Sequence, residues 1–165
     1  MIARLVFASS CMAYAVGLGV AAVVLPSRVP LHFGASGEVD RWGSRSEAVL
    51  LFTVLGVAMA VLLGWLASRT PTLPESRLNV PHKRWWTALP AREERMRAML
   101  ATDLYVVGAA TVLLLLGLLI ATVSAARADD PRLGAPFVVL AVAYVVALAG
   151  WLGYLFLRRY RPRSE

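Results

Sequence analysis

Charged residues are scarce in this sequence of 165 residues. They make up 16% of the chain, while 59% of the residues are hydrophobic and the mean hydropathy is +0.66. Soluble domains usually contain about 25% charged residues, so the composition argues strongly against a soluble enzyme or a soluble DNA-binding domain. Cysteine occurs once, at Cys11, which excludes an intrachain disulfide. Histidine occurs twice, which leaves few nitrogen ligands for a metal site.

Four long apolar runs contain no Asp, Glu, Lys or Arg. They cover about 5–25, 48–67, 104–126 and 135–157. A bilayer core of about 30 Å needs about 20 helical residues, and lipid offers no partners to an unpaired backbone. The sequence therefore predicts an all-α, polytopic membrane protein with four transmembrane helices in a single membrane domain, 1–165. The first run starts after Arg4 like a signal peptide, but its 21 residues exceed the length of a secretory apolar core, so we expect it to be retained.

The basic residues are distributed unequally between the two sides of these helices. Twelve of the 17 Lys and Arg residues precede the first run, lie in the connection 68–103 or follow the fourth run, where they are Arg158, Arg159, Arg161 and Arg163. The positive-inside rule then places both termini and the basic loop 68–103 in the cytoplasm, and the loop 26–47 outside. Trp65, Trp151 and Tyr160 are predicted to lie at the cytoplasmic interface.

Residues inside the runs favour packing over transport. The runs lack the ionisable groups that pumps and ion-coupled carriers usually place at membrane depth. Small residues recur at four-residue spacing, which lets helix backbones approach closely. They are Ala15 and Gly19; Gly56, Ala60 and Gly64; Gly117 and Ala121; and Ala149 and Gly153. We expect these faces mainly to serve packing within the chain, with oligomerisation as the alternative.

The external loop 26–47 has a specific residue pattern. Its prolines favour an extended path and its glycines allow tight turns. The positions that carry the pattern are Pro26, Pro30, His32, Gly37, Asp40, Trp42, Gly43 and Ser44. In these residues the chain resembles the bacterial membrane-protein family called domain of unknown function 1648. The resemblance covers at least residues 20–65 and implies a location in the bacterial inner (plasma) membrane.

A second segment is similar to one found in stand-alone members of that family. It has Asn79, Pro81, Lys83 and Trp86 at the matching spacing, but His82 and Gly34 stand where such members often have asparagine. The same domain occurs at the front of SdpI-type proteins, which combine immunity to a secreted peptide toxin with membrane capture of a transcriptional repressor. The resemblance implies a sensing or immunity role by analogy.

Three interpretations of the external loop are open. His32 and Asp40 are expected to hydrogen-bond within the loop and fix its turns; with Glu38 they could instead bind zinc, although their spacing fits no metal motif. The third interpretation is recognition of a ligand or partner through exposed Phe33, Arg41 and Trp42. The candidate recognition residues are Pro30, His32, Phe33, Gly37, Asp40, Arg41, Trp42 and Gly43.

The basic loop 68–103 suggests contact with anionic lipids, since Lys and Arg near a charged membrane surface each contribute about 1 kcal/mol. Docking of a cytosolic transcriptional regulator is the alternative, and direct nucleic-acid binding is not expected. The candidate residues are Asn79, Pro81, Lys83, Arg84, Trp85 and Trp86. Pro90, followed by two glutamates, predicts a helix start, and we expect that helix to lie at the interface before bending into the third span.

Catalytic motifs are not found in the sequence. It has no Gly-rich phosphate loop and no Ser-His-Asp set on one side of the membrane. We therefore expect a non-enzymatic protein without a cofactor or a metal, which acts by binding, sensing or immunity through its external loop. The alternative is an accessory or structural subunit of a membrane complex such as a transporter.

Overall fold

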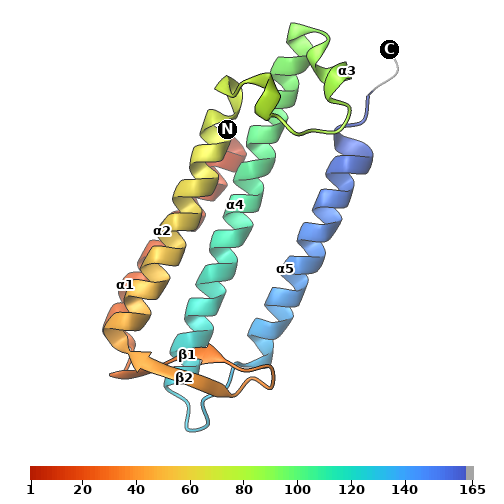
Figure 1. Cartoon of the computed structure of the whole chain (residues 1–165). Coiled ribbons are helices and arrows are strands. Elements are labelled where there is room, and N and C mark those ends of the chain that lie inside the picture. The colour runs from red at the N-terminus through yellow and green to blue at the C-terminus, as the bar shows by residue number, and fades with distance from the viewer. Residues whose placement is uncertain (163–165) are drawn as a thin grey trace.

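Four long helices run side by side in the computed structural model, which describes residues 1–162 (Figure 1). They are α1 (Ile2–Val24), α2 (Arg45–Arg69), α4 (Pro90–Ala126) and α5 (Ala135–Tyr154). Each is long and apolar enough to cross a membrane, and their positions match the four apolar runs. The prediction of an all-α fold with four spans is confirmed. Arg163, one of the basic residues near the C-terminus, lies outside the described residues.

Short elements join the long helices at both ends. A β-hairpin links α1 to α2, and three short helical segments link α2 to α4 at the opposite end (Figure 1). The short elements are β1 (Arg28–Phe33), β2 (Val39–Ser44), η1 (Thr70–Thr72), η2 (Glu75–Arg77), α3 (Lys83–Thr87) and η3 (Leu155–Arg159). The last of these, η3, is a π-helical turn that continues α5.

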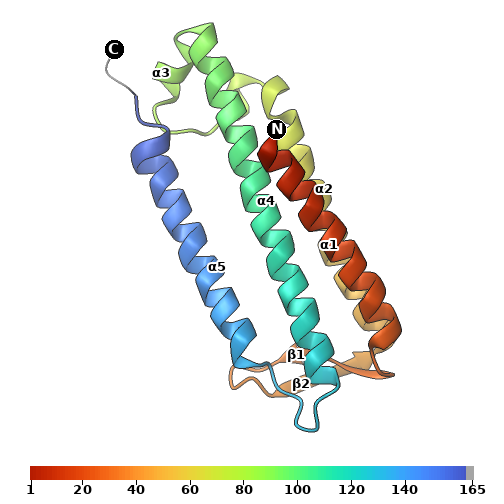
Figure 2. The ribbon, with the colours of Figure 1, turned by 180° about the vertical axis from the view of Figure 1, so that it is seen from behind.

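Helix α4 packs against the other three helices, with α1 and α2 on one side and α5 on the other (Figure 2). Glycines allow the close approach. A Cβ on Gly56 would lie 2.1 Å from the Tyr14 ring, and one on Gly117 would lie 2.4 Å from Leu140. These contacts confirm internal packing for the faces that carry Gly56 and Gly117. Gly19 and Gly153, by contrast, face open space.

Helix α4 is a single helix of 37 residues. It begins at Pro90, as the sequence predicts, and is about 55 Å long at about 1.5 Å per residue. The predicted bend between an interfacial segment and the third span is wrong, since no glycine or proline interrupts residues 91–103 and the helix continues without a break. Its polar first turns therefore extend the third span beyond the apolar part of the bundle.

Helix α5 is the least embedded of the four, and no residue along it is buried. It contacts α4 through Leu140, which fills the space beside Gly117, and through a hydrogen bond of 2.8 Å between the hydroxyl oxygens of Thr111 and Tyr144. Most of its apolar side chains point away from the bundle, where lipid would surround them.

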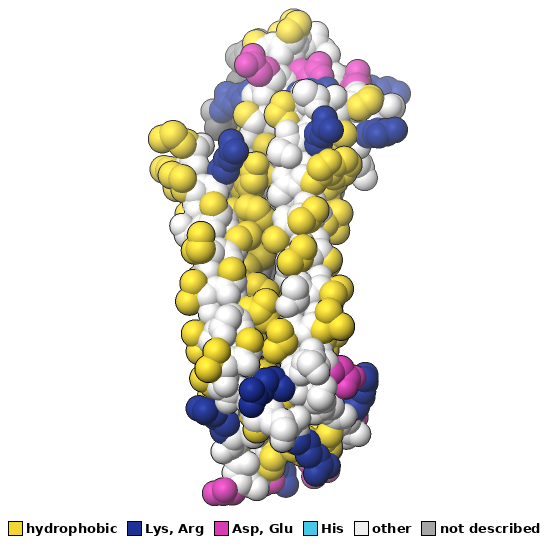
Figure 3. Space-filling model, turned by 90° about the vertical axis from the view of Figure 1, so that its left-hand side faces the viewer, with side chains coloured by type: hydrophobic (Ala, Val, Ile, Leu, Met, Phe, Trp, Pro, Cys, Tyr) yellow, Lys and Arg dark blue, Asp and Glu magenta, His cyan; other side chains and the backbone are white. Residues whose placement is uncertain are grey.

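The face of the molecule drawn in Figure 3 divides into three bands along the helices. Figure 3 shows hydrophobic side chains over the middle and charged side chains at the two ends. This distribution and the four apolar helices are those of a multi-pass integral membrane protein.

Candidate functional site

The loop 26–47 folds into an antiparallel hairpin of β1 and β2, in which Pro30 pairs with Trp42. Its turn is closed by a hydrogen bond of 2.8 Å from the Gly34 amide to the Glu38 carbonyl, and Gly37 adopts a φ of 81°. The sequence predicts an extended path with tight turns here, but not the pairing of two strands. A side chain at position 37 would be strained at this positive φ.

One face of the hairpin packs against the ends of the helices. Val29 and the preceding Leu25 are fully buried, in a cluster with Phe52 of α2 and Leu119 of α4. Pro30 is also fully buried. The expectation that Pro30 presents a recognition surface is therefore wrong: its ring is part of the packing beneath the hairpin.

The tip of the hairpin is held by the connection between α4 and α5. The Leu133 amide donates a hydrogen bond of 2.9 Å to the Gly37 carbonyl, and Arg132 lies 4.0 Å from the Glu38 carboxylate. A Cβ on Gly37 would lie 3.4 Å from the Leu133 carbonyl oxygen. Two connections that are distant in sequence thus form one platform across this end of the bundle.

The outer face of the hairpin carries two polar pairs. The His32 Nδ1 and Asp40 Oδ1 atoms are 2.6 Å apart, with the two side chains 67% and 52% exposed, and Arg41 donates a hydrogen bond to Glu47. The hydrogen bond between His32 and Asp40 confirms the expectation that these residues bond within the loop. Within residues 1–162 no group of three His, Cys, Asp or Glu side chains is placed to hold a metal ion.

The aromatic side chains of the hairpin are less exposed than the recognition interpretation assumes. Phe33 and Trp42 are both half-buried. The Arg28 guanidinium lies 4.5 Å from the centre of the Trp42 ring, a cation–π arrangement. Gly43 lies so close to Leu31 that a Cβ there would be 2.2 Å from its methyl group. The polar pairs, and not the aromatic rings, form most of the exposed outer face.

At the opposite end of the bundle, the basic loop folds back on the helices. Leu78 and Val80 are buried, and Trp86 of α3 is only 5% exposed. The Trp86 Nε1 donates a hydrogen bond of 3.0 Å to the Tyr160 carbonyl. Trp86 therefore mainly ties the loop to the end of the chain and offers little surface to an outside partner. The other candidate residues of this loop are exposed (Asn79, Arg84) or half-buried (Pro81, Lys83, Trp85).

A buried carboxylate of α4, that of Asp103, lies at this same end of the bundle. Asp103 accepts hydrogen bonds of 2.9 Å from Arg159 Nε and from the Tyr160 hydroxyl on one of its oxygens, Oδ2. Burial and the Asp103 charge raise the pKa of the Tyr160 hydroxyl, so the phenol stays protonated and donates. Tyr160 offers little of its ring to lipid, because the ring is buried against Trp86.

This cluster could have been found from the sequence. Asp103 directly precedes the third apolar run and Arg159 closely follows the fourth. Consecutive antiparallel spans bring these two positions to the same end of the bundle, where opposite charges can pair.

The model of the family described as "Domain of unknown function (DUF1648)" matches residues 11–57. The first hairpin and parts of the helices around it are thus similar to this family. The matched residues include much of α1, both strands and the first half of α2. The matched segment therefore comprises the hairpin of the platform and parts of the helices beneath it.

A relative from Archaeoglobus fulgidus, named only as an uncharacterized protein, is 54% identical over 39 residues. The match covers 24% of this chain and 21% of the relative, so this chain spans about a fifth of that protein's length. No solved structure matches this chain. The DUF1648 likeness thus identifies the segment without supplying an activity.

Proposed function

We propose that this membrane protein acts by binding, with the outer face of the DUF1648 hairpin recognising an external ligand or partner in a sensing or immunity role. The observation that carries the proposal is the exposed pair of His32 and Asp40 on a firmly supported hairpin. Exposed ion pairs contribute about 0–1 kcal/mol to stability. A pair with so little effect on folding, held on a rigid platform, is suited to contact with another molecule.

The platform supports recognition because its geometry is fixed before any partner arrives. The Gly37 carbonyl is bonded to the α4–α5 connection, and Val29 is buried against the helices. Rigid presentation lowers the entropy lost on binding. The two polar pairs offer an imidazole, two carboxylates and a guanidinium, which together suit a peptide carrying both donors and acceptors.

In this proposal the hairpin faces the exterior of a bacterial inner membrane and both termini lie in the cytoplasm. The unequal distribution of basic residues supports that orientation. Single cysteines at Ser36→Cys and Ser76→Cys, each in a Cys11→Ala background, provide the test. An impermeant maleimide applied to intact cells should label position 36 and reach position 76 only after permeabilisation. Labelling of position 76 alone in intact cells would reverse the orientation.

The recognition role is tested by complementation of a deletion strain challenged with membrane-active peptides. Wild-type protein and a Ser36→Ala control on the same hairpin should restore survival. The double variant His32→Ala/Asp40→Ala should reach the membrane at the same level and fail to restore it. Full restoration by the double variant would overturn the proposed role of this pair.

Helix α5 favours a second candidate function, an accessory or structural subunit of a membrane complex such as a transporter. Among the long helices it packs mainly against α4, and none of its residues is buried. Such a helix leaves a wide apolar surface for another membrane chain. Stoichiometric co-purification with larger membrane chains would support the subunit role, whereas a cytosolic transcriptional regulator in the complex would support signalling.

A further inference from the structure

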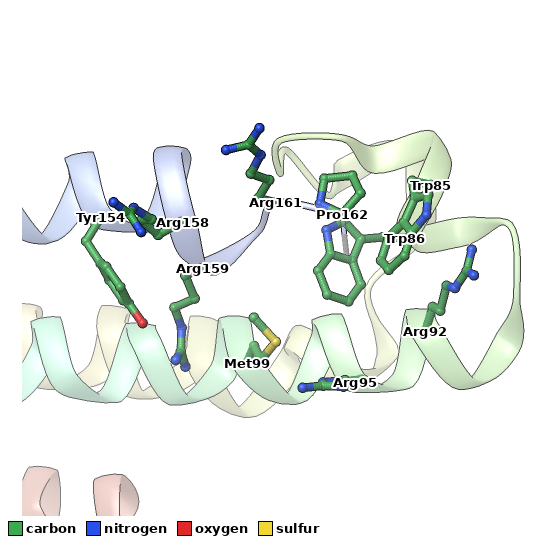
Figure 4. Close-up of a pocket in the computed structure, with 10 residues that line it drawn as sticks. All are labelled: Trp85, Trp86, Arg92, Arg95, Met99, Tyr154, Arg158, Arg159, Arg161 and Pro162. Carbon is green, nitrogen blue, oxygen red and sulfur yellow. The ribbon is translucent and has the colours of Figure 1, made fainter. Parts of the chain in front are cut away.

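A cavity of about 580 Å³ lies at the end of the bundle opposite the hairpin. Its walls come from α3, from the first turns of α4 and from the segment that ends α5 (Figure 4). Five arginines line it: Arg92, Arg95, Arg158, Arg159 and Arg161. No Asp or Glu among the described residues does so.

The arginines around this cavity differ in their partners among the described residues. Arg159 is paired with Asp103, whose side chain is 4% exposed and lies behind the cavity wall. Arg92 stacks on the Trp85 ring at 4.1 Å, a cation–π arrangement. Within residues 1–162, Arg95, Arg158 and Arg161 form no ion pair with a carboxylate. Guanidinium groups gathered around one space repel each other unless an anion neutralises them.

The walls of the cavity are rigid at the points that set the arginine positions. Asp103 holds both Arg159 and Tyr160, and the Trp86 indole is bonded to the Tyr160 carbonyl. Arg158 and Arg161 flank this fixed pair in the chain. A phosphate group has several acceptor oxygens, and arginine binds such groups by paired hydrogen bonds.

The position of the cavity favours a lipid as the source of the anion. Tyr154 and Arg158 belong to the last turns of the fourth span, so the cavity lies where the apolar band gives way to the charged end. Lipid phosphates occupy this level of a bilayer. Tyr154, Met99 and Trp85 add apolar wall beside the arginines, which suits the glycerol and the first acyl carbons of a phospholipid.

We propose that this arginine cavity is a binding site for the phosphate of an anionic phospholipid in the adjacent leaflet. The site is independent of the hairpin, which lies at the other end of the helices. Arg95, Arg158 and Arg161 contact the phosphate oxygens, and the Asp103 cluster keeps the facing segments in register.

Native mass spectrometry of the detergent-solubilised full chain tests the proposal, with phosphatidylglycerol and phosphatidylcholine titrated separately. Wild-type protein should bind phosphatidylglycerol saturably and at least about tenfold more tightly than phosphatidylcholine. The Arg158→Gln/Arg161→Gln variant should lose about tenfold in phosphatidylglycerol affinity, since charged hydrogen bonds are lost. Both side chains are exposed, so an unchanged melting temperature serves as the check on folding.

The matched control removes the same charge at the same end of the bundle. Arg69 and Arg77 are exposed and lie outside the cavity lining. Arg69→Gln/Arg77→Gln should keep phosphatidylglycerol affinity within about twofold of wild type, since surface pairs outside the site contribute little. An equal loss in both double variants would mean diffuse attraction to charge and would overturn the proposed site.

Soluble competitors distinguish a lipid from a free phosphate. Inorganic phosphate and glycerol 3-phosphate should displace phosphatidylglycerol only at concentrations far above that of the lipid. Binding of either soluble compound as tightly as phosphatidylglycerol would reject the lipid as the ligand. The Arg95→Gln variant alters the α4 wall alone. A loss of phosphatidylglycerol affinity in this variant would show that the two walls act on one phosphate, and unchanged affinity would contradict this arrangement.

Discussion

Replacing Asp103 with alanine should destabilise the protein more than any change at an exposed carboxylate. The Asp103 side chain is 4% exposed and that of Arg159 is 23% exposed, so their ion pair is largely shielded from water. Removing one partner of a buried pair costs about 3–5 kcal/mol, because the other charge is left uncompensated. The remaining exposure of Arg159 places the expected loss near the lower end, at about 3 kcal/mol.

The assay is equilibrium unfolding of the purified protein in mixed micelles with a denaturing detergent, followed by circular dichroism. Asp103→Asn should lose about 2–3 kcal/mol, somewhat less than alanine, because the Arg159 charge again lacks its partner while the amide oxygen still accepts from the Tyr160 hydroxyl. Asp129→Ala, at an exposed position between α4 and α5, is the matched control. A loss for Asp103→Ala no larger than for Asp129→Ala would refute the view that this carboxylate anchors the end of α5.

Two further predictions concern packing. Gly56→Ala should lower the free energy of unfolding by about 1–3 kcal/mol, since its new methyl group would lie 2.1 Å from the hydrogen-bonded Tyr14 ring. Gly19→Ala, whose methyl group would meet nothing within 4 Å, should leave that free energy unchanged. Equal effects of the two variants would contradict the packing of α2 against α1. Trp86→Phe should lower the free energy of unfolding by about 1 kcal/mol, because its buried indole hydrogen bond is lost. The control is Trp65→Phe on the exposed surface of α2. An equal effect of both variants would show that the hydrogen bond does not hold the basic loop.

The long helices could be predicted because their signal is local. An uncharged run of about 20 residues has one stable arrangement in lipid, and the structure places a helix over each run. The start of α4 at Pro90 was equally local. The continuation of α4 through residues 91–103 could not be predicted, because a polar stretch with no helix breaker fits either an interfacial helix or the extension of a span.

The hairpin and the arginine cavity depend on contacts between distant residues. Pairing of β1 with β2 is stabilised by the burial of Val29 against Leu119, far along the chain in α4. Prolines and glycines in this loop predict turns and obscure the strands. Asp103 and Arg159 are separated by 56 positions, so their pairing follows only when the predicted third and fourth spans are placed antiparallel and adjacent.

The hold on α5 is uneven along its length. In its middle, α5 contacts α4 through the Thr111–Tyr144 hydrogen bond and through Leu140 beside Gly117. At one end Arg159 pairs with Asp103, and at the other end the Leu133 amide is bonded to the hairpin tip. Salt screens the exposed pair of Arg132 and Glu38 at the hairpin end, whereas the largely buried pair of Arg159 and Asp103 is screened much less. The fourth helix is thus held mainly at its two ends, and we expect added salt to weaken the hairpin end more than the end at Asp103.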